Sequence, residues 1–547
     1  MLPKAKTYEE VQARFKWNVP HFYNIATDAC DVWARTHPKK VALLYLCEGG
    51  GEEAWSYGAL SAASNKLANA FKAMGITRGD RVGILLSQTP ETAITHFASY
   101  KLGAITVPLA ALFGPEALLY RLKTSGAKGL ITDQEGLLKL SGIRNRLPDL
   151  EFVVCIDGER TGSYDFHNLL SRSSECFDPI PTLAEDPAVM IYTSGTTGAP
   201  KGALLPHRVL LGHIPGIQLS HDLFPQKGDL FWTPSDWAWA GGLFNALMPS
   251  LKMGVPVIAK KLRKFDPEEA FRLLCNYKVR NAFIPPTALK IMSGVNARRY
   301  VPDLNLRSLC SAGEPLGSAA YDWAKSILNV TPNEMYGQTE CNLVLGSCQK
   351  LGVSRSGAIG KPVVGHNVTL LKDDGKKAEA GEQGQIAIHK SSPTMFLEYW
   401  RHKSLTQAKF QGEWMLTGDQ AVMDEDGYFH FVGRNDDIIT SAGYRIGPAE
   451  VEDCLVTHPK IALAAVVGKP DPVRTEVVKA YIVLNEGTTQ GSELKKSIQQ
   501  WVRLRLSAHE YPREIEFVAE LPLTTTGKII RQKLRHRASS EVMAIAD

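Results

Sequence analysis

The chain has little of what marks several common protein classes. Its nine cysteines are scattered over 547 residues without a CxxC pair, which argues against a disulfide framework and a zinc knuckle. Its 62 basic and 57 acidic residues nearly cancel, so the dense basic surface typical of nucleic-acid binding is not indicated. The longest apolar stretch, residues 103–114, is too short to span a bilayer and contains Pro108.

The start of the chain lacks targeting features. It has no apolar segment of the kind found in signal peptides, and Glu9 and Glu10 argue against a transit peptide. The 14 histidines show no metal-ligand spacing. We therefore expect a cytoplasmic protein that spans no membrane and has no nucleic-acid partner.

Strand and helix patterns alternate over most of the chain, which is 44% hydrophobic and can bury large cores. Strands are predicted at residues 81–86, 105–109, 188–192, 255–259, 281–284 and 308–310. Because helical patterns separate them, two α/β layers are expected in about the first 350 residues. Glycine-rich turns and short alternating runs over residues 357–433 predict a small β unit. An α+β segment follows, and we expect domains at 1–435 and 436–547.

The most informative segment, residues 192–202, directly follows a predicted buried strand. Its glycines permit tight turns, its hydroxyls and backbone N–H groups can face phosphate oxygens, and Lys201 adds a cation. A Walker A loop requires GxxxxGK[ST], but here Pro200 precedes Lys201 and Gly202 follows it. The segment is therefore predicted to be a phosphate-binding loop of another kind.

Residues 192–202 resemble the phosphate loop of the adenylate-forming superfamily, which includes acyl-CoA synthetases, peptide synthetase adenylation domains and firefly luciferase. Further family motifs occur in order at residues 311–316, 336–340, 414–419, 433–437, 443–452 and 524–528. The match looks closest to the medium-chain acyl-CoA synthetases. The resemblance implies an α/β protein whose large N-terminal domain has two stacked α/β subdomains and a small β-barrel-like unit. A smaller, mobile α+β C-terminal domain would follow.

The resemblance implies a two-step reaction. A carboxylic acid and ATP give an acyl-adenylate and pyrophosphate, and CoA then displaces AMP. Glu340 and Thr196 would hold Mg²⁺, a cation that prefers oxygen ligands. The residues expected to bind the nucleotide are Thr193, Ser194, Gly195, Thr196, Thr197, Gly198, Lys201, Gly313, Glu314, Pro315, Glu334, Met335, Tyr336, Gly337, Gln338, Thr339, Asp419, Arg434 and Lys528.

The resemblance also divides the two steps within the C-terminal domain. Lys528 would serve the adenylation step, because its long stem delivers one ammonium to the carboxylate and α-phosphate oxygens. Asp436 aligns with the hinge about which this domain turns. The residues expected to bind CoA are Ala442, Gly443, Tyr444, Arg445 and Arg474. The basic run that follows Lys528 is expected to be a solvated helix.

An aromatic motif is expected to wall the acid pocket through Trp237, Trp239 and Gly241. Acetate-specific relatives have a Trp where this chain has Gly337, so the missing indole suggests room for a medium-length, branched or small aromatic acid. Relatives continue with Thr-Gly after the position of Glu340, whereas this chain has Cys341-Asn342. That departure leaves the chain length of the acid open.

Two alternatives remain at this point. The enzyme could load a carrier-protein thiol in place of CoA, although Arg474 and the lack of an attached carrier domain favour CoA. A non-catalytic adenylate-binding protein is disfavoured because Glu340, Asp419, Arg434 and Lys528 are all retained.

Overall fold

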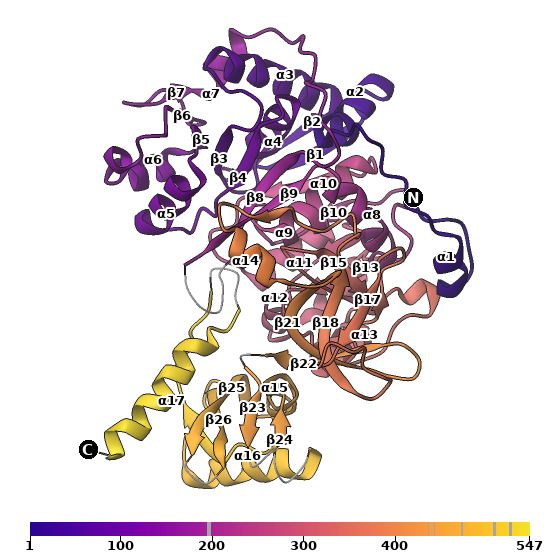
Figure 1. Cartoon of the computed structure of the whole chain (residues 1–547), viewed down its shortest axis with the longest axis vertical. Helices are drawn as coiled ribbons and strands as arrows, with labels where there is room; N and C mark the ends of the chain where they lie inside the picture. The colour runs from indigo at the N-terminus through magenta and orange to yellow at the C-terminus, as the bar shows by residue number, and fades with distance from the viewer. Residues whose placement is uncertain are drawn as a thin grey trace.

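A computed structural model describes residues 1–193, 199–435, 437–441, 444–471, 474–506, 510–524 and 528–546, with backbone only for 444–445 and 542–546. Two lobes are visible in Figure 1: a large one containing the first three sheets, and a smaller one containing the last sheet and the C-terminal helix. The chain begins with α1 (Tyr8–Arg14) and α2 (Val32–Thr36). The mixed α/β class predicted from the alternating pattern is confirmed.

The first sheet has eight strands in the order β19-β9-β8-β4-β3-β5-β6-β7. Its strands are β3 (Arg81–Leu85), β4 (Ile105–Pro108), β5 (Gly129–Thr132), β6 (Phe152–Cys155), β7 (Tyr164–Asp165), β8 (Pro187–Thr193), β9 (Lys201–Pro206) and β19 (Glu398–Tyr399). The helices in this part of the chain are α3 (Tyr57–Ala73), α4 (Pro90–Lys101), α5 (Pro115–Ser125), α6 (Gln134–Ser141) and α7 (Phe166–Ser171). Strands β3 to β8 pair in parallel, and the buried residues of β8 explain its continuous apolar run.

The second sheet has nine strands in the order β16-β15-β14-β13-β12-β10-β11-β1-β2. These are β1 (Val41–Leu46), β2 (Glu52–Ser56), β10 (Phe231–Trp232), β11 (Val257–Lys260), β12 (Asn281–Phe283), β13 (Ser308–Ala312), β14 (Pro332–Gln338), β15 (Asn342–Gly346) and β16 (Lys361–Pro362). Its helices are α8 (Val209–Ser220), α9 (Ala240–Gly242), the π-helix η3 (Leu243–Leu247), α10 (Met248–Lys252), α11 (Pro267–Asn276), α12 (Pro286–Ser293) and α13 (Ser318–Ile327). Both large sheets contribute strands to the site described below.

The small β unit is an antiparallel sheet in the order β17-β18-β21-β20, with β22 paired to β21. Its strands are β17 (Val368–Leu371), β18 (Gln383–His389), β20 (Phe410–Gln411), β21 (Trp414–Met423) and β22 (Phe429–Arg434), with α14 (Lys403–Ala408) between them. This is the unit predicted at residues 357–433 from glycine-rich turns. It brings the ends of β21 and β22 to the nucleotide motifs of the second sheet.

The smaller lobe contains the sheet β24-β23-β26-β25, with β27 added to β26. Its elements are β23 (Ile439–Ser441), β24 (Tyr444–Ile446), α15 (Pro448–Val456), β25 (Ile461–Asp471), β26 (Thr475–Leu484), α16 (Ser492–Arg505), β27 (Glu514–Phe517) and α17 (Arg531–Ala546). The chain passes from one lobe to the other between Arg434 and Ile439, on either side of the expected hinge. This is the α+β unit predicted after residue 436.

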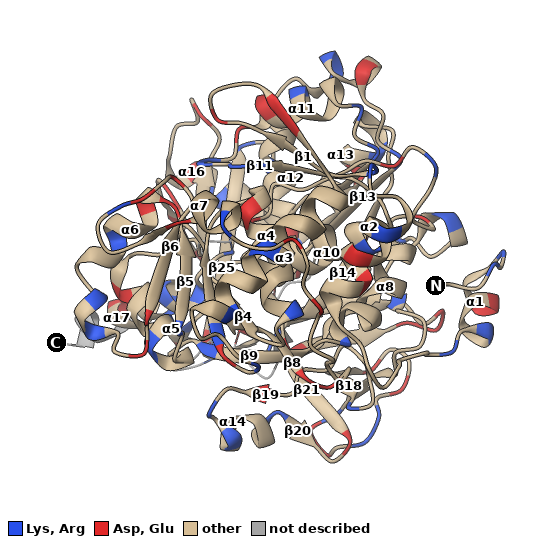
Figure 2. Ribbon diagram, turned by 90° about the horizontal axis from the view of Figure 1, so that it is seen from above, with Lys and Arg blue, Asp and Glu red and all other residues tan. Residues whose placement is uncertain are grey.

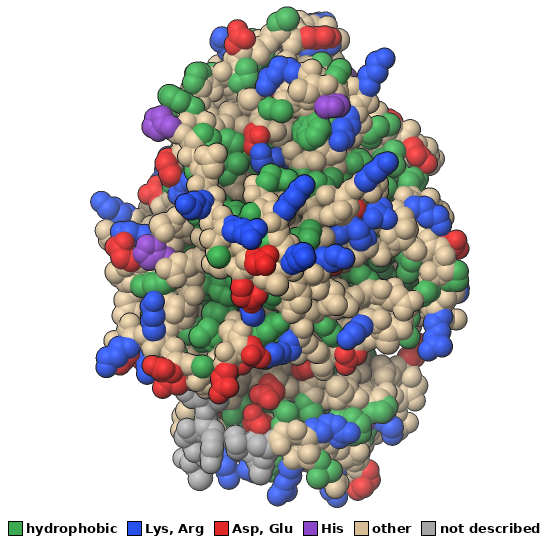
Figure 3. Space-filling view, turned by 90° about the vertical axis from the view of Figure 1, so that its right-hand side faces the viewer, with side chains coloured by type: hydrophobic (Ala, Val, Ile, Leu, Met, Phe, Trp, Pro, Cys, Tyr) green, Lys and Arg blue, Asp and Glu red, His purple; other side chains and the backbone are tan. Residues whose placement is uncertain are grey.

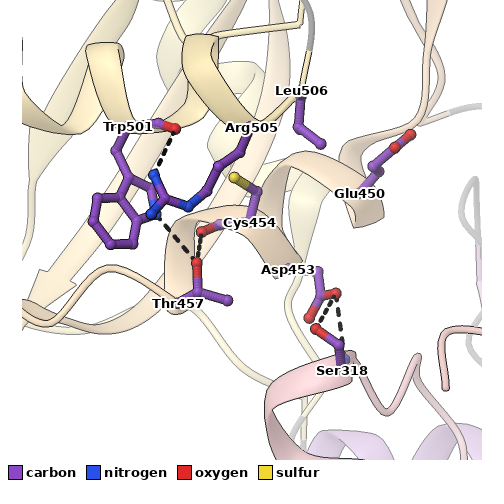
Figure 4. A pocket seen from close by; sticks show the side chains of 8 residues that line it. All are labelled: Ser318, Glu450, Asp453, Cys454, Thr457, Trp501, Arg505 and Leu506. Atoms are coloured by element: carbon purple, nitrogen blue, oxygen red, sulfur yellow. Dashed lines mark hydrogen bonds between the residues drawn. The ribbon is translucent and has the colours of Figure 1, made fainter.

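The two lobes meet where α15 faces the start of α13. The Asp453 carboxylate accepts hydrogen bonds from the Ser318 backbone N–H at 3.3 Å and from its hydroxyl at 3.2 Å, so it caps a helix of the other lobe. Beside this contact is a cavity of about 500 Å³, shown in Figure 4. On its far side the Arg505 guanidinium lies over Trp501, 3.3 Å from the ring centroid.

Acidic and basic residues are interspersed over the ribbon in Figure 2 and over the surface in Figure 3. The basic run on α17 differs from the expected solvated helix. Arg531 pairs with Glu452 at 2.5 Å, and Arg535 pairs with Asp437 next to the expected hinge. These cations therefore fasten α17 to the rest of the smaller lobe.

The helices and the cysteines bear on the expected lack of a membrane span and of disulfides. Within the part of the chain that the structure describes, no helix is both long and apolar enough to cross a bilayer. All nine cysteines are described, and each is a free thiol.

Candidate active site

The expected phosphate loop joins β8 to β9, and the two residues that flank it are directly paired. Thr193 lies opposite Lys201 in this antiparallel ladder. The Tyr120 hydroxyl donates to the carbonyl of Pro200 at 3.0 Å, which fixes the residue that leads into β9. The expected phosphate ligands Ser194, Gly195, Thr196, Thr197 and Gly198 lie outside the described residues.

Tyr399, a residue that sequence reasoning missed, lies next to both Glu340 and Lys201. Strand β19 pairs with β9 so that Tyr399 is opposite Ala203. Its hydroxyl donates to Glu340 Oε1 at 2.5 Å, and the ammonium of Lys201 lies 5.4 Å from its ring centroid. Burial and the Glu340 charge raise the pKa of Tyr399, so it stays a hydrogen-bond donor. No motif marks Tyr399, because only the pairing of distant strands brings it here.

Glu340 is 6% exposed, and no cation pairs with it among the described residues. One carboxylate oxygen is engaged by Tyr399, which leaves the other available to a ligand. A buried carboxylate without a protein cation fits a hard divalent ion. The described residues include no cluster of three or more His, Cys, Asp or Glu that could hold a metal unaided, so phosphate and hydroxyl oxygens would complete the shell.

Asp419 gathers three of the residues expected to bind nucleotide. Its Oδ2 accepts from the Tyr336 hydroxyl and from the Gln338 amide, each at 2.6 Å, and its Oδ1 lies 3.4 Å from the Arg434 guanidinium. The β21–β22 register places Asp419 opposite Arg434. Burial, followed by the Asp419 charge, raises the pKa of Tyr336 well above its ordinary value. The arrangement offers oriented acceptors suited to a ribose diol.

Gly313 and Glu314 follow β13 and face the C-terminal lysine. Gly313 has φ +105°, and a Cβ built on it would lie 3.7 Å from Cε of Lys528. Glu314 Oε1 accepts from the backbone N–H of Thr287 at 2.8 Å and also from its hydroxyl. Thr287 was missed by sequence reasoning because no motif carries it. Pro315 is exposed beside this pair.

Lys528 reaches from the smaller lobe into the cleft of the large one. Its backbone N–H is held by the Thr524 hydroxyl at 3.0 Å. The side chain keeps some solvent access. The surrounding protein nevertheless desolvates the ammonium, and this lowers the pKa of Lys528. The charges of Glu314 and Asp419 raise that pKa in part. A cation is thus held close to Gly313 and near the carboxylates of the cleft.

Around Tyr336, the side chain of Met335, which is 3% exposed, lies in the core, whereas those of Glu334 and Thr339 are half-buried. Glu334 accepts from the Leu316 N–H at 3.3 Å. Burial, together with the charge of Asp453 on the other lobe, raises the pKa of Glu334 to about 7.

The aromatic motif is divided between core and pocket. Trp237 has no exposed surface and packs in the core, which corrects the expectation that it walls a pocket. Trp239 is half-buried, with its ring edge-on to Phe113 at 5.7 Å between centroids. A Cβ on Gly241 would lie 3.2 Å from the ring of Phe283. Trp239 and Gly241 are thus the members of the motif that border accessible space.

Gly337 requires another correction. A Cβ on this residue would lie 1.4 Å from the carbonyl oxygen of Asn342, so an indole cannot be added here without moving the β14–β15 hairpin. Asn342 adopts φ +52°, a left-handed conformation that Asn tolerates better than most residues. The hairpin keeps its turn despite the Cys341-Asn342 departure, and glycine at 337 serves the close backbone approach.

The residues expected to bind CoA come together only in part. Ala442, Gly443 and the expected hinge Asp436 lie outside the described residues. Tyr444 and Arg445 form β24, and Arg474 is half-buried between β25 and β26 with its N–H bound to Asp471 at 2.8 Å. Because Ser441 pairs with Thr475, the C-terminal end of β23 and Arg474 lie at the same end of the sheet.

Comparison with known proteins finds matching family models, related sequences and similar solved structures. Family models for the AMP-binding enzyme and for its C-terminal domain match residues 30–400 and 450–528. The mitochondrial acyl-coenzyme A synthetase ACSM3 of Rattus norvegicus is 33% identical, covering 97% of this chain and 93% of that protein. The crystal structure of the anthranilate CoA ligase AuaEII with anthranoyl-AMP aligns at TM-score 0.88 and 29% identity, covering 97% of this chain and 99% of that one. An acyl-CoA synthetase of Brucella canis aligns at TM-score 0.76 and 33% identity, covering 98% and 99%.

Proposed function

This chain belongs to the AMP-binding enzyme family, and from that membership we propose how its cleft works as an AMP-forming acyl-CoA synthetase. The enzyme joins a carboxylic acid to ATP, giving an acyl-adenylate and pyrophosphate, and then transfers the acyl group to the thiol of CoA with release of AMP. The observation that carries the proposal is the approach of Lys528 to Gly313, in the cleft that also holds Asp419.

In the adenylation step an anion attacks a polyanion, so positive charge is needed at the α-phosphate. Lys528 supplies an ammonium there and stabilises the negative charge that develops on the phosphorus oxygens. Asp419 accepts from the ribose hydroxyls, with Tyr336 and Gln338 holding its carboxylate in place. Residues 313–315, Glu334 and residues 336–339 frame the adenine and the α-phosphate. These contacts fix the nucleotide so that its α-phosphate meets the acid.

The β- and γ-phosphates are assigned to the loop between Thr193 and Lys201. Glu340 and Thr196 would hold Mg²⁺, which when bound neutralises charge on the phosphates and favours departure of pyrophosphate. Tyr399 fixes the Glu340 carboxylate through its hydroxyl. The ammonium of Lys201, 5.4 Å from the centroid of the Tyr399 ring, adds a second cation near the leaving group.

The thioester step is assigned to a second pose of the C-terminal domain, residues 436–547, turning about Asp436. Residues 442–445 would then line the path of the pantetheine chain, and Arg474 would meet CoA phosphate. The shared end of the sheet supports this grouping, because the Ser441–Thr475 pairing keeps these segments together in any pose. Asp437 is tied to Arg535 and so moves with the smaller lobe.

The acid is proposed to be of medium length, branched or small and aromatic. The half-buried Trp239 and its neighbour Phe113 offer an apolar wall, and the solved relative with anthranoyl-AMP accepts an aromatic acid. We place the enzyme in the cytoplasm, because nine free thiols suit a reducing compartment.

The test is pyrophosphate and AMP release with ATP, Mg²⁺ and CoA over straight-chain acids from acetate to dodecanoate, isobutyrate and benzoate. A peak at one acid, with matching AMP and acyl-CoA, is expected. Pyrophosphate release that needs the acid but leaves CoA unconsumed would assign the acyl group to a carrier-protein thiol. No release with any acid, although ATP binds, would refute the proposed reaction.

A further inference from the structure

We propose that Asn245 and His213 form a polar end to the acid pocket, and that they select an acid whose chain or ring carries a hydrogen-bond acceptor, such as a carbonyl or hydroxyl group. The inference rests on the proposed function and specifies the substrate class of the same site. It assigns substrate contact to Asn245 and a positioning role to His213.

Asn245 keeps solvent access inside a segment that is otherwise buried. It lies in the π-helix η3, between Phe244 and Ala246, which have no exposed surface, whereas Asn245 is half-buried. Gly241, four residues earlier, is also half-buried. Residues four apart share a helix face, so Asn245 borders the accessible space reached by the aromatic motif.

His213 lies on α8 and is 1% exposed. Its Nε2 is 2.6 Å from Oδ1 of Asn245. An amide oxygen only accepts, so Nε2 carries the proton and donates it. Burial lowers the pKa of His213 to about 4, so the ring is neutral near pH 7. His213 therefore fixes which way the Asn245 amide points.

This orientation leaves the NH₂ group of Asn245 able to donate a hydrogen bond to a substrate. With Oδ1 engaged by His213, its two N–H donors make no side-chain hydrogen bond within the described part of the chain. An apolar substrate tail would cover these donors without replacing their hydrogen bonds to water, which is costly. A carbonyl or hydroxyl oxygen at this point would satisfy one of them. The pair therefore selects for an acceptor and against plain alkyl chains.

The pair lies between the aromatic motif and the nucleotide motif. Helix α8 contacts η3, β14 and β15. At Gly216, one turn after His213, a Cβ would lie 2.5 Å from Cδ2 of Leu343, so the helix packs tightly against the strand that follows the Glu340 motif. The Phe244 ring lies 6.0 Å from the His213 ring and closes its apolar side. The polar pair thus has rigid neighbours that hold its geometry.

The test compares kcat/KM for matched acids that differ only in an acceptor: hexanoate against its keto and hydroxy derivatives, and benzoate against its hydroxy and acetyl derivatives. At least one acceptor-bearing acid is expected to exceed its plain parent by about tenfold or more. Asn245→Leu should lower that ratio by about tenfold, because the acceptor-bearing acid loses its hydrogen-bond donor and the plain acid no longer covers unsatisfied N–H groups. Asn245→Asp, which keeps the size but removes the donors, should lower it as well.

A matched control is Ser250→Ala, which removes a buried hydroxyl from α10, directly after η3, and should leave the ratio unchanged. His213→Phe should reduce the ratio as well, because it removes the hydrogen bond that orients the Asn245 amide. If the wild type prefers the plain acids, or if both Asn245 variants change both acids equally, the inference is overturned and the synthetase function stands. If no acid is turned over, the proposed function fails and the inference falls with it.

Discussion

The hydroxyl of Tyr399 donates a 2.5 Å hydrogen bond to the carboxylate of Glu340, a residue 59 positions away in the chain. Tyr399 belongs to the first sheet through β19, whereas Glu340 follows β14 of the second sheet. The bond therefore connects the two α/β layers at the point where the phosphates of ATP are proposed to bind.

Tyr399→Phe is expected to loosen the Glu340 carboxylate while keeping the ring beside Lys201. A hydrogen bond to a charged group contributes about 1.5–3 kcal/mol, so kcat/KM for ATP should fall about tenfold to hundredfold. Measuring this value over a range of Mg²⁺ concentrations checks the prediction. Tyr164→Phe, at a tyrosine that is 53% exposed, is the control. Equal kinetics for the two variants would show that the bond does not position Glu340.

Lys528→Ala should separate the two half-reactions. We expect acyl-adenylate formation to fall by about a thousandfold, because the ammonium at the α-phosphate is lost, while preformed acyl-adenylate still reacts with CoA. Lys533→Ala, at an exposed lysine on α17, should affect neither step. Pyrophosphate release and thioester formation are measured separately. Equal loss of both steps in Lys528→Ala would refute the assignment of this lysine to adenylation.

Gly337→Trp and Gly337→Ala should both damage the β14–β15 hairpin, since any Cβ at this position meets the Asn342 carbonyl oxygen. We expect losses of about 2 kcal/mol or more in unfolding free energy, with loss of activity on every acid. Gly142→Ala is the control, because a Cβ there has no neighbour within 4 Å. Thermal unfolding decides the outcome. A stable Gly337→Trp enzyme that merely prefers shorter acids would restore the view of Gly337 as the pocket floor.

Glu334 should make folding stability depend on pH. Its folded-state pKa of about 7 lies above the ordinary 4.5, so between these values the folded chain holds a proton that the unfolded chain has lost. The free energy of unfolding should therefore fall as pH rises from about 4.5 to about 7, by on the order of 1–3 kcal/mol, and then level off. Glu334→Gln should flatten this part of the curve.

Denaturant unfolding from pH 4.5 to pH 8 measures that dependence, with Glu425→Gln, at an exposed residue, as the matched control. The control should keep the wild-type slope. If Glu334→Gln keeps it as well, the raised pKa does not contribute to stability.

Periodic apolar runs located most of the elements, because burial on one or both faces leaves a strong local signal. The run at 188–192 became β8, and the run at 81–86 became β3. The motifs at residues 192–202 and 524–528 led to the predicted phosphate loop and to Lys528, because glycines, hydroxyls and a lysine in a fixed order are a local pattern. Charge pairing on α17 was not identifiable, since Asp437 and Glu452 meet it only through the fold.

By itself, the sequence determined the fold class, the order of the motifs and the residues predicted to bind the nucleotide, since backbone geometry and charge act over short spans. The tertiary structure alone decided which distant groups touch: Tyr399 with Glu340, Asn342 with Gly337, and His213 with Asn245. It also decided that Trp237 belongs to the core while Trp239 borders the cleft. Contacts of this kind depend on strand order and side-chain packing, which are properties of the whole chain and leave no mark in any local pattern.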